Sequence, residues 1–294
     1  MENRPPRSVL YLPGANARAL EKAREIPTDA IILDLEDSIA PDAKEMARYQ
    51  VTKAVKTGGY GQREIVVRIN GLSTPWGRDD LDAALRADPD AILVPKVSDP
   101  ADVSAVQEAI TTAGSRTQIW AMIETPLSIG NVFSLAGART TLTTALSAFV
   151  IGTNDLVKEM QMRPTPGRAH LVPLLATCVA AARAHGIHII DGVYNALDDE
   201  DGFRAECEQG RDLGMDGKSL IHPRQVQPCN SAFSPSKDEI ARARRLVEVF
   251  DLPENRDAGV LRIDGHMAER LHLHVAKQIL AAADRLDSSH SIDE

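Results

Sequence analysis

Short runs rich in β-branched and other apolar residues alternate with segments of helical spacing along most of this chain. The alternation predicts a parallel sheet, in which each strand is followed by a helix that returns the chain to the next strand. Eight β/α units within about 230 residues fit a closed α/β fold, the (β/α)8 TIM barrel. A doubly wound open sheet is the weaker alternative, because no GxGxxG turn follows an early strand. The expected strands are 9–12, 30–35, 65–69, 91–94, 119–123, 148–151, 187–190 and 219–221.

The barrel is expected to occupy residues 1–230, and a C-terminal helical extension residues 231–294. Ser236 and Glu239 have capping-box spacing and predict a helix through about residue 250. A short apolar run at 260–264, a turn at Gly265 and an amphipathic helix over about 267–286 follow. The extension is too small to hold its own core, so we expect it to pack on the barrel or on a neighbouring subunit, and the protein to be a homo-oligomer.

Composition narrows the class of protein and the kind of partner. The chain of 294 residues is 43% hydrophobic and 26% charged, with a net charge of −9, which is typical of a soluble globular protein. This charge argues against nucleic acid or an anionic membrane surface as the main partner. The start has no apolar signal core, and no apolar run is long enough to span a membrane. The three cysteines lack ligand spacing, so we expect inert thiols and a cytoplasmic location.

Two of the apolar runs end on carboxylates. Glu124 follows the run 119–123, and Asp155 comes shortly after the run 149–151. The carboxyl ends of parallel strands meet at the mouth of a barrel, where two facing carboxylates repel unless a cation or a shared proton lies between them. The pair therefore suggests a divalent metal site. The alternative is that both residues cap the segments that follow.

Other strand ends in the same expected mouth carry charged side chains. Arg68 is suited to holding a substrate carboxylate or enolate, or else forms a salt bridge to Glu36 or Asp37. Lys96 would form a Schiff base in a metal-free aldolase if it were desolvated, although charge balance among the carboxylates is favoured. His222, before a proline, is interpreted as a packing and hydrogen-bonding residue.

The segment 34–44 places acids at a strand end and a basic residue at the entry to a helix. Asp37 is a candidate to orient a metal-bound water. Lys44 and Arg48 are candidates to meet phosphates near the helix N-terminus, or else lie on a solvated helix face.

Several motifs, in order and over nearly the whole chain, resemble the citrate lyase β-subunit-like proteins of the HpcH/HpaI aldolase superfamily. They are LYLPGAN at 10–16, LDLEDS at 33–38, VRIN at 67–70, VPK at 94–96, MIETP at 122–126, DL at 155–156 and GMDGKSLIHP at 214–223. Simple pyruvate aldolases of the superfamily usually carry Gly-Glu-His where this chain has Leu35-Glu-Asp37, so the resemblance favours the acyl-CoA lyase branch.

The resemblance implies a Mg²⁺-dependent barrel enzyme, trimeric or hexameric, that cleaves a malyl-, citramalyl- or citryl-CoA thioester into an acyl-CoA and a 2-oxo acid. It makes Glu124 and Asp155 the metal ligands and Arg68 a substrate ligand. Glu36, Lys44 and Glu124 are expected to contact substrate as well, and Asp37 to act in catalysis. Mg²⁺ on the substrate carboxylate and hydroxyl would lower the hydroxyl pKa and allow C–C cleavage.

In this family a C-terminal Met-Ile-Asp element from a neighbouring subunit donates the acid that protonates the carbanion. The aligned stretch here is 265–271, in which Glu269 replaces the aspartate. Glu269 keeps the carboxyl but reaches one methylene farther, which could change the substrate or favour thioester hydrolysis. The alternatives to a lyase are therefore a malyl-CoA-type thioesterase, a Schiff-base aldolase using Lys96, and a non-catalytic CoA-ester binding protein.

Overall fold

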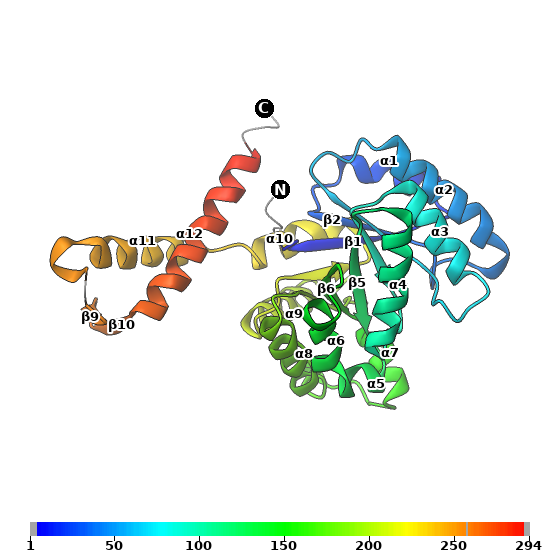
Figure 1. Cartoon of the computed structure of the whole chain (residues 1–294). Helices are drawn as coiled ribbons and strands as arrows, with labels where there is room; N and C mark the ends of the chain where they lie inside the picture. Colours follow the sequence, from blue (N-terminus) through cyan, green and yellow to red (C-terminus); the bar gives the residue numbers. More distant parts are fainter. Residues whose placement is uncertain (1–4, 257, 291–294) are drawn as a thin grey trace. The chain divides into compact units, whose positions relative to one another are not determined.

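The computed structural model describes residues 5–256 and 258–290, and within them eight parallel strands close into a barrel (Figure 1). Each strand pairs with the next in sequence, and β8 returns to pair with β1. The predicted (β/α)8 barrel is confirmed. The strands are β1 Ser8–Pro13, β2 Ala30–Asp34, β3 Glu64–Arg68, β4 Ala91–Val94, β5 Gln118–Ile123, β6 Leu146–Ile151, β7 His188–Asp191 and β8 Gly217–Leu220.

Helices and short 3₁₀ turns connect the strands and surround the barrel (Figure 1). The α-helices are α1 Ala17–Lys22, α2 Lys44–Thr57, α3 Gly77–Ala87, α4 Pro100–Ala113, α5 Pro126–Gly130, α6 Val132–Thr141, α7 Thr153–Glu159, α8 Val172–Ala184, α9 Glu200–Asp212 and α10 Val226–Ala232. The 3₁₀ turns are η1 Ala23–Glu25, η2 Pro41–Ala43, η3 Pro166–Arg168 and η4 Pro223–Gln225.

The strands bury both of their faces, which explains why they read as nearly continuous apolar runs. In β2, Ala30 and Ile32 belong to a cluster inside the barrel, whereas Ile31 and Leu33 pack in the layer between strands and helices. Because side chains alternate along a strand, Asp34 falls on the same side as Ala30 and Ile32. Asp34 and Arg68 are register partners across β2 and β3, so their side chains share the inner face at the mouth.

The remaining residues form a separate compact unit over Ser234–Glu294, so the division falls after Phe233. The expected boundary after residue 230 lies within α10, a helix that belongs to the barrel unit. The second unit contains α11 Lys237–Asp251, the 3₁₀ turn η5 Pro253–Asn255, β9 Val260–Ile263, β10 His266–Glu269 and α12 Arg270–His290. Ser236 and Glu239 form the predicted capping box of α11.

The expected helix start at about residue 267 was wrong. Asp264 and Gly265 both have positive φ, of 51° and 87°, which is the backbone of a two-residue hairpin turn. The turn sends residues 266–269 back along β9 as a strand, and the helix begins only at Arg270.

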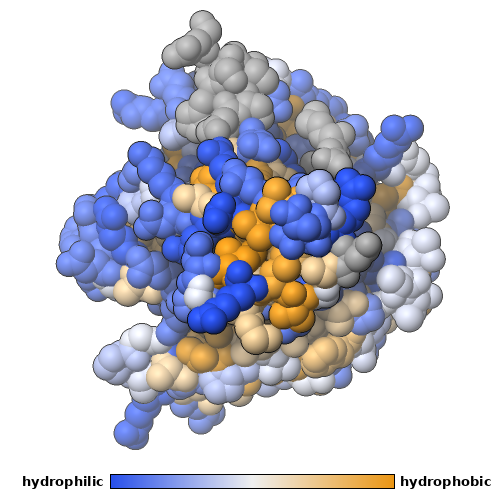
Figure 2. Space-filling view, turned by 90° about the vertical axis from the view of Figure 1, so that its left-hand side faces the viewer, coloured by the Kyte–Doolittle hydropathy of each residue, from blue (hydrophilic) through white to orange (hydrophobic). Residues whose placement is uncertain are grey.

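Among the described residues of this unit, none covers one face of the hairpin. Val260 pairs with Glu269 and Arg262 with Met267, and all four side chains are exposed, Met267 at 71%. Figure 2 shows a cluster of apolar side chains, bordered by hydrophilic ones, on the side of the molecule that it displays.

Among the described residues, no helix combines the length and apolar character that a membrane span requires.

Candidate active site

A cavity of about 370 Å³ opens where the strands end. Its lining comes from the ends of several strands and the loops after them, as expected for the catalytic face of a parallel barrel. The ionisable side chains that line it are Tyr11, Asp34, Asp37, Arg68, Glu124 and Asp155. Among the described residues, the lining therefore has four carboxyl groups and one guanidinium. Acidic groups outnumber basic ones, which favours binding of a cation.

Arg68 is held in this cavity by a bidentate ion pair with Asp34. Nε lies 2.6 Å from Oδ1 and Nη2 lies 2.8 Å from Oδ2, and both side chains are buried. Burial opposes ionisation of Asp34, but Arg68 outweighs it and holds the pKa of Asp34 below its usual value. The guanidinium also stacks on Tyr11, with 4.9 Å from Cζ to the ring centroid. Arg68 is therefore a fixed cation rather than a mobile one.

Glu36 and Asp37 both approach Arg68, but in different environments. Glu36 is buried, and its Oε2 lies 2.8 Å from Arg68 Nη1. Burial, opposed by Arg68, raises the pKa of Glu36. The Asp37 side chain is 60% exposed, and its Oδ2 lies 3.5 Å from the same nitrogen. The salt bridges that the sequence offered as the alternative role of Arg68 are thus both present, and the main partner is Asp34.

Glu124 lies one residue beyond β5 and is 1% exposed. Burial, together with nearby Glu36 and Asp155, raises the pKa of Glu124 to about 8. Asp155 lies in the first turn of α7, and the two carboxyl groups line the same cavity. Such a carboxyl ionises readily at neutral pH only when a positive charge is added beside it.

These two residues fit a hard divalent cation. The described chain contains no group of three or more His, Cys, Asp or Glu side chains arranged to hold a metal. Mg²⁺ does not need one, because it is commonly bound through one or two carboxylates and keeps several waters or substrate oxygens. Glu124 and Asp155, on an otherwise acidic wall, are therefore the residues that would hold it.

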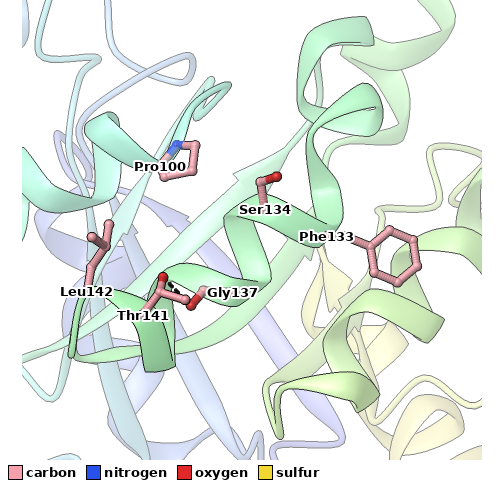
Figure 3. Close-up of a pocket in the computed structure, with 6 residues that line it drawn as sticks. All are labelled: Pro100, Phe133, Ser134, Gly137, Thr141 and Leu142. Carbon is pink, nitrogen blue, oxygen red and sulfur yellow. Dashed lines mark hydrogen bonds between the residues drawn. The ribbon is translucent and has the colours of Figure 1, made fainter.

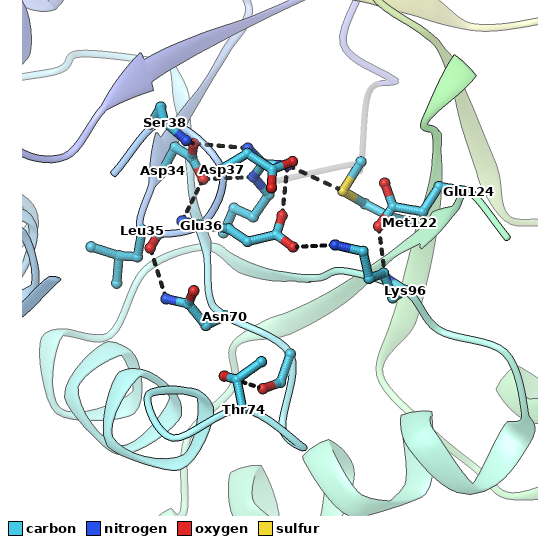
Figure 4. A network of polar contacts seen from close by, with 12 residues as sticks. Asp34, Leu35, Glu36, Asp37, Ser38, Asn70, Thr74, Lys96, Met122 and Glu124 are labelled. Carbon is cyan, nitrogen blue, oxygen red and sulfur yellow. Dashed lines mark hydrogen bonds and ion pairs between the residues drawn. The ribbon is translucent and has the colours of Figure 1, made fainter. Parts of the chain in front are cut away.

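Lys96 follows β4 and donates hydrogen bonds to both Glu124 and Glu36. Its backbone N–H donates to Glu124 Oε1 at 2.7 Å, and its Nζ donates to Glu36 Oε1 at 3.1 Å (Figure 4). Although burial acts to lower it, the pKa of Lys96 is raised because Glu36 outweighs that effect. A lysine that stays protonated is a poor nucleophile, so the geometry disfavours Schiff-base chemistry at this residue.

Lys44 takes a different role from the one that the sequence indicated. Its Nζ donates to the carbonyl oxygens of Leu35 and Glu36 and to Asn70 Oδ1, at 2.8 to 2.9 Å, and the side chain is buried. An ammonium group has three hydrogens, so all are committed to shaping the loop after β2. Because a phosphate contact would require breaking these bonds, the geometry does not support Lys44 as a substrate ligand.

Two further predicted residues lie in the described chain. His222 Nδ1 accepts from the N–H of Arg224 at 3.2 Å and caps the 3₁₀ turn η4, as its packing interpretation suggested. Glu269 is exposed at the end of β10, so it belongs to the second unit. The cavity is accordingly built from residues of the barrel unit.

Asp34, the main partner of Arg68, is not among the site residues that the sequence predicts. Strand alternation from Ala30 through Ile32 could have placed it on the inner face. Sequence reasoning also missed a buried ion cluster in which Arg168 and Lys218 contact Asp191 at 2.6 Å and 3.0 Å. Through Arg168, this cluster links the loop between α7 and α8 to β7, and through Lys218 it links β7 to β8.

A second hollow, of about 460 Å³, lies along α4 and α6 (Figure 3). Pro100, Phe133, Ser134, Gly137, Thr141 and Leu142 line it. None of these side chains is ionisable at ordinary pH, so this hollow lacks the groups that acid–base or metal chemistry needs.

The chain is similar in sequence and fold to several known proteins. The (3S)-malyl-CoA thioesterase of Cereibacter sphaeroides is 48% identical over 282 residues, covering 96% of each chain. The citrate lyase subunit beta of Escherichia coli is 33% identical, covering 96% of this chain and 95% of that one. The solved structure of CitE from Mycobacterium tuberculosis, in complex with magnesium, acetoacetate and coenzyme A, has a TM-score of 0.79 at 24% identity and covers 96% of this chain and 99% of that one.

The family described as HpcH/HpaI aldolase/citrate lyase matches residues 7–223, which is the barrel and most of its loops. The resemblance drawn from the motifs is confirmed by this match. The chain belongs to the HpcH/HpaI aldolase/citrate lyase family.

Proposed function

We propose that this protein is a Mg²⁺-dependent enzyme that hydrolyses a malyl-CoA-type thioester to a 2-hydroxy dicarboxylic acid and free CoA. The observation that carries the proposal is the meeting of the Glu124 and Asp155 carboxyl groups with the fixed Arg68 guanidinium in one cavity. The choice of hydrolysis is supported by relatives named (3S)-malyl-CoA thioesterase, which are 47% or 48% identical over 96% of the chain.

Glu124 and Asp155 would hold the ion and thereby place the carboxylate end of the substrate. When bound, Mg²⁺ would supply Lewis-acid polarisation of the substrate carboxylate and hydroxyl oxygens. The four lining carboxyl groups would otherwise repel an anionic substrate, so the ion also makes its binding electrostatically possible.

Arg68 would stabilise the negative charge that develops on the thioester oxygen. Three contacts, to Asp34, Glu36 and Tyr11, fix the guanidinium before substrate arrives, so little reorganisation is needed as charge develops. Asp37 is the exposed acid beside it, and we assign to it the proton of the attacking water. The water oxygen bonds to the thioester carbon, the C–S bond breaks, and the thiolate leaves.

Cleavage of the C–C bond is the second candidate, supported by relatives named citrate lyase subunit beta at 32% to 34% identity. In that reaction the hydroxyl loses its proton, a 2-oxo acid departs, and the thioester enolate left behind is protonated by an acid. Glu269 is the residue that we assign to this protonation, in a site of a neighbouring subunit.

The exposed hairpin face supports such an arrangement. Val260 and Met267 are apolar side chains left in solvent at 49% and 71% exposure, beside Arg262 and Glu269. A second copy of this chain would cover the apolar pair and receive the two charged groups, as in a closed homo-oligomer. We therefore propose a trimer or hexamer in which the second unit completes an adjoining site.

The test is incubation of the purified protein with (3S)-malyl-CoA and Mg²⁺ in H₂¹⁸O, followed by mass spectrometry. Hydrolysis gives free CoA and malate with one ¹⁸O in the new carboxylate, whereas C–C cleavage gives glyoxylate and acetyl-CoA. Treatment with EDTA, and the matched E124Q variant, should each abolish turnover. Full activity after complete removal of divalent ions would overturn the role given to Glu124 and Asp155.

A further inference from the structure

Lys96 has a backbone conformation that a lysine rarely adopts. Its φ is +53°, in the left-handed region, directly after β4 and Pro95. A side chain with a β-carbon is disfavoured there relative to glycine. Such a conformation persists only where the surroundings stabilise it, so the contacts that it makes possible are of interest.

The backbone amide of Lys96 is aimed at the metal-binding carboxyl. Its N–H donates to Glu124 Oε1 at 2.7 Å, a short bond to an oxygen that is otherwise buried. A hydrogen bond of this kind fixes one carboxylate oxygen and leaves the other for the cavity.

The side chain of Lys96 acts on the other half of the site. Its ammonium lies 3.1 Å from Glu36 Oε1, while Glu36 Oε2 lies 2.8 Å from Arg68 Nη1. Glu36 is thus shared between two cations, one on each of its oxygens. If Lys96 were absent, Glu36 would have only Arg68 as a cationic partner among these contacts, and its whole negative charge would act on Nη1 in competition with substrate.

We propose that Lys96 is a positioning residue that couples the two halves of the site: its amide orients Glu124, and its ammonium balances part of the negative charge of Glu36 so that Arg68 stays available to substrate. The inference rests on the proposed function, since it concerns the same cavity. The two contacts come from different atoms of one residue, so substitutions can separate them.

Three variants separate the contact of the amide with Glu124 from the contact of the ammonium with Glu36. K96G keeps the left-handed backbone and the amide but removes the ammonium. K96R keeps the positive charge. K96V removes the ammonium and, because a β-branched residue resists positive φ, also displaces the amide. Mn²⁺ binding, measured by EPR titration, reports on Glu124 without turnover, and malyl-CoA kinetics report on Arg68.

K96G should bind Mn²⁺ within about twofold of wild type, melt at or above the wild-type temperature, and lose about tenfold or more in kcat/KM. K96R should recover most of that loss. K96V should weaken Mn²⁺ binding by about tenfold. A merely structural role for Lys96 would not lower activity in a variant that is at least as stable as wild type.

Thr143→Gly is the matched control. Thr143 also has positive φ, of 51°, and an exposed side chain, but it precedes β6 at the end of the barrel opposite the mouth. This change should raise the melting temperature without altering metal binding or kinetics.

Wild-type kcat/KM in K96G would overturn the role of the ammonium, and wild-type Mn²⁺ affinity in a folded K96V would overturn the role of the amide. If wild-type protein does not act on malyl-CoA, the proposed substrate fails, and the comparison of Mn²⁺ binding between K96G and K96V still decides whether the amide positions Glu124.

Discussion

A β-carbon at position 152 would lie 2.5 Å from both Cβ and Oε2 of Glu124. Gly152 follows β6, and Glu124 follows the adjacent strand β5, so the two residues face each other at the mouth. The absence of a side chain at 152 is what allows the Glu124 carboxyl to occupy its present place.

We therefore expect Gly152→Ala to displace Glu124 and to weaken metal binding and turnover by about a hundredfold, with a stably folded barrel. Mn²⁺ titration and kinetics measure the loss, and thermal melting checks the fold. Gly130→Ala is the control, because a β-carbon there meets no atom within 4 Å. Normal Mn²⁺ affinity in the 152 variant would contradict the assignment of Glu124 as a metal ligand.

Removing one partner of the buried Asp34–Arg68 pair should lower the free energy of unfolding more than replacing both partners with apolar residues. Asp34→Asn removes the main counter-charge of a buried guanidinium, and we expect a loss of about 3 kcal/mol in the free energy of unfolding. The double variant D34L/R68M should recover part of that stability while remaining inactive. Urea denaturation measures both.

Asp198→Asn tests whether burial is the reason that Asp34→Asn lowers the free energy of unfolding. Asp198 pairs with Arg224 at 3.2 Å, but its side chain is 98% exposed. The change should cost less than about 0.5 kcal/mol. Equal losses for the two aspartates would refute the argument.

Glu64 should make stability depend on pH. It begins β3, where burial, with Asp90 nearby, raises its pKa from 4.5 to about 7. Between these values the folded state binds more protons than the unfolded state, so this contribution is fully present below pH 4.5 and is lost as pH rises through 7.

Glu64→Gln replaces the titrating carboxyl with a neutral amide and so removes its contribution to the pH dependence of stability. Relative to wild type, the variant should gain about 1–2 kcal/mol in unfolding free energy on going from pH 5 to pH 8, since the side chain is partly exposed and the full linkage value does not apply. Glu108→Gln, at an exposed position of α4, is the control and should show no such difference. Parallel pH profiles for wild type and the Glu64 variant would exclude the effect.

The assignment of Glu269 to a neighbouring site predicts complementation in C–C cleavage between two variants that each lack this reaction. E124Q lacks a metal ligand of the barrel, and E269Q lacks the proposed acid of the second unit. After co-refolding at equal amounts, about a quarter of the sites would combine a normal barrel with a normal neighbouring hairpin. C–C cleavage should recover to about that fraction, while a site completed within one chain would give no recovery.

The sequence predicted the barrel well because the apolar runs are short, evenly spaced and bounded by polar segments, and local patterning of this kind survives folding. It placed Glu124, Asp155 and Arg68 at strand ends for the same reason. It could not show that Lys44 is buried, because that depends on the path of the loop whose carbonyl groups surround its ammonium. It also started the last helix too early, since His266–Glu269 have no strand pattern of their own and pair only because the turn at Asp264 and Gly265 returns them to β9.

The register of β2 against β3 places Asp34 opposite Arg68. Side chains alternate with a period of two, so a slip by one residue would turn the guanidinium into the apolar layer beneath the helices and leave it without its partner. The buried ion pair at the mouth therefore penalises a misaligned sheet. A chain folded in the wrong register would lack the fixed guanidinium on which the proposed activity depends.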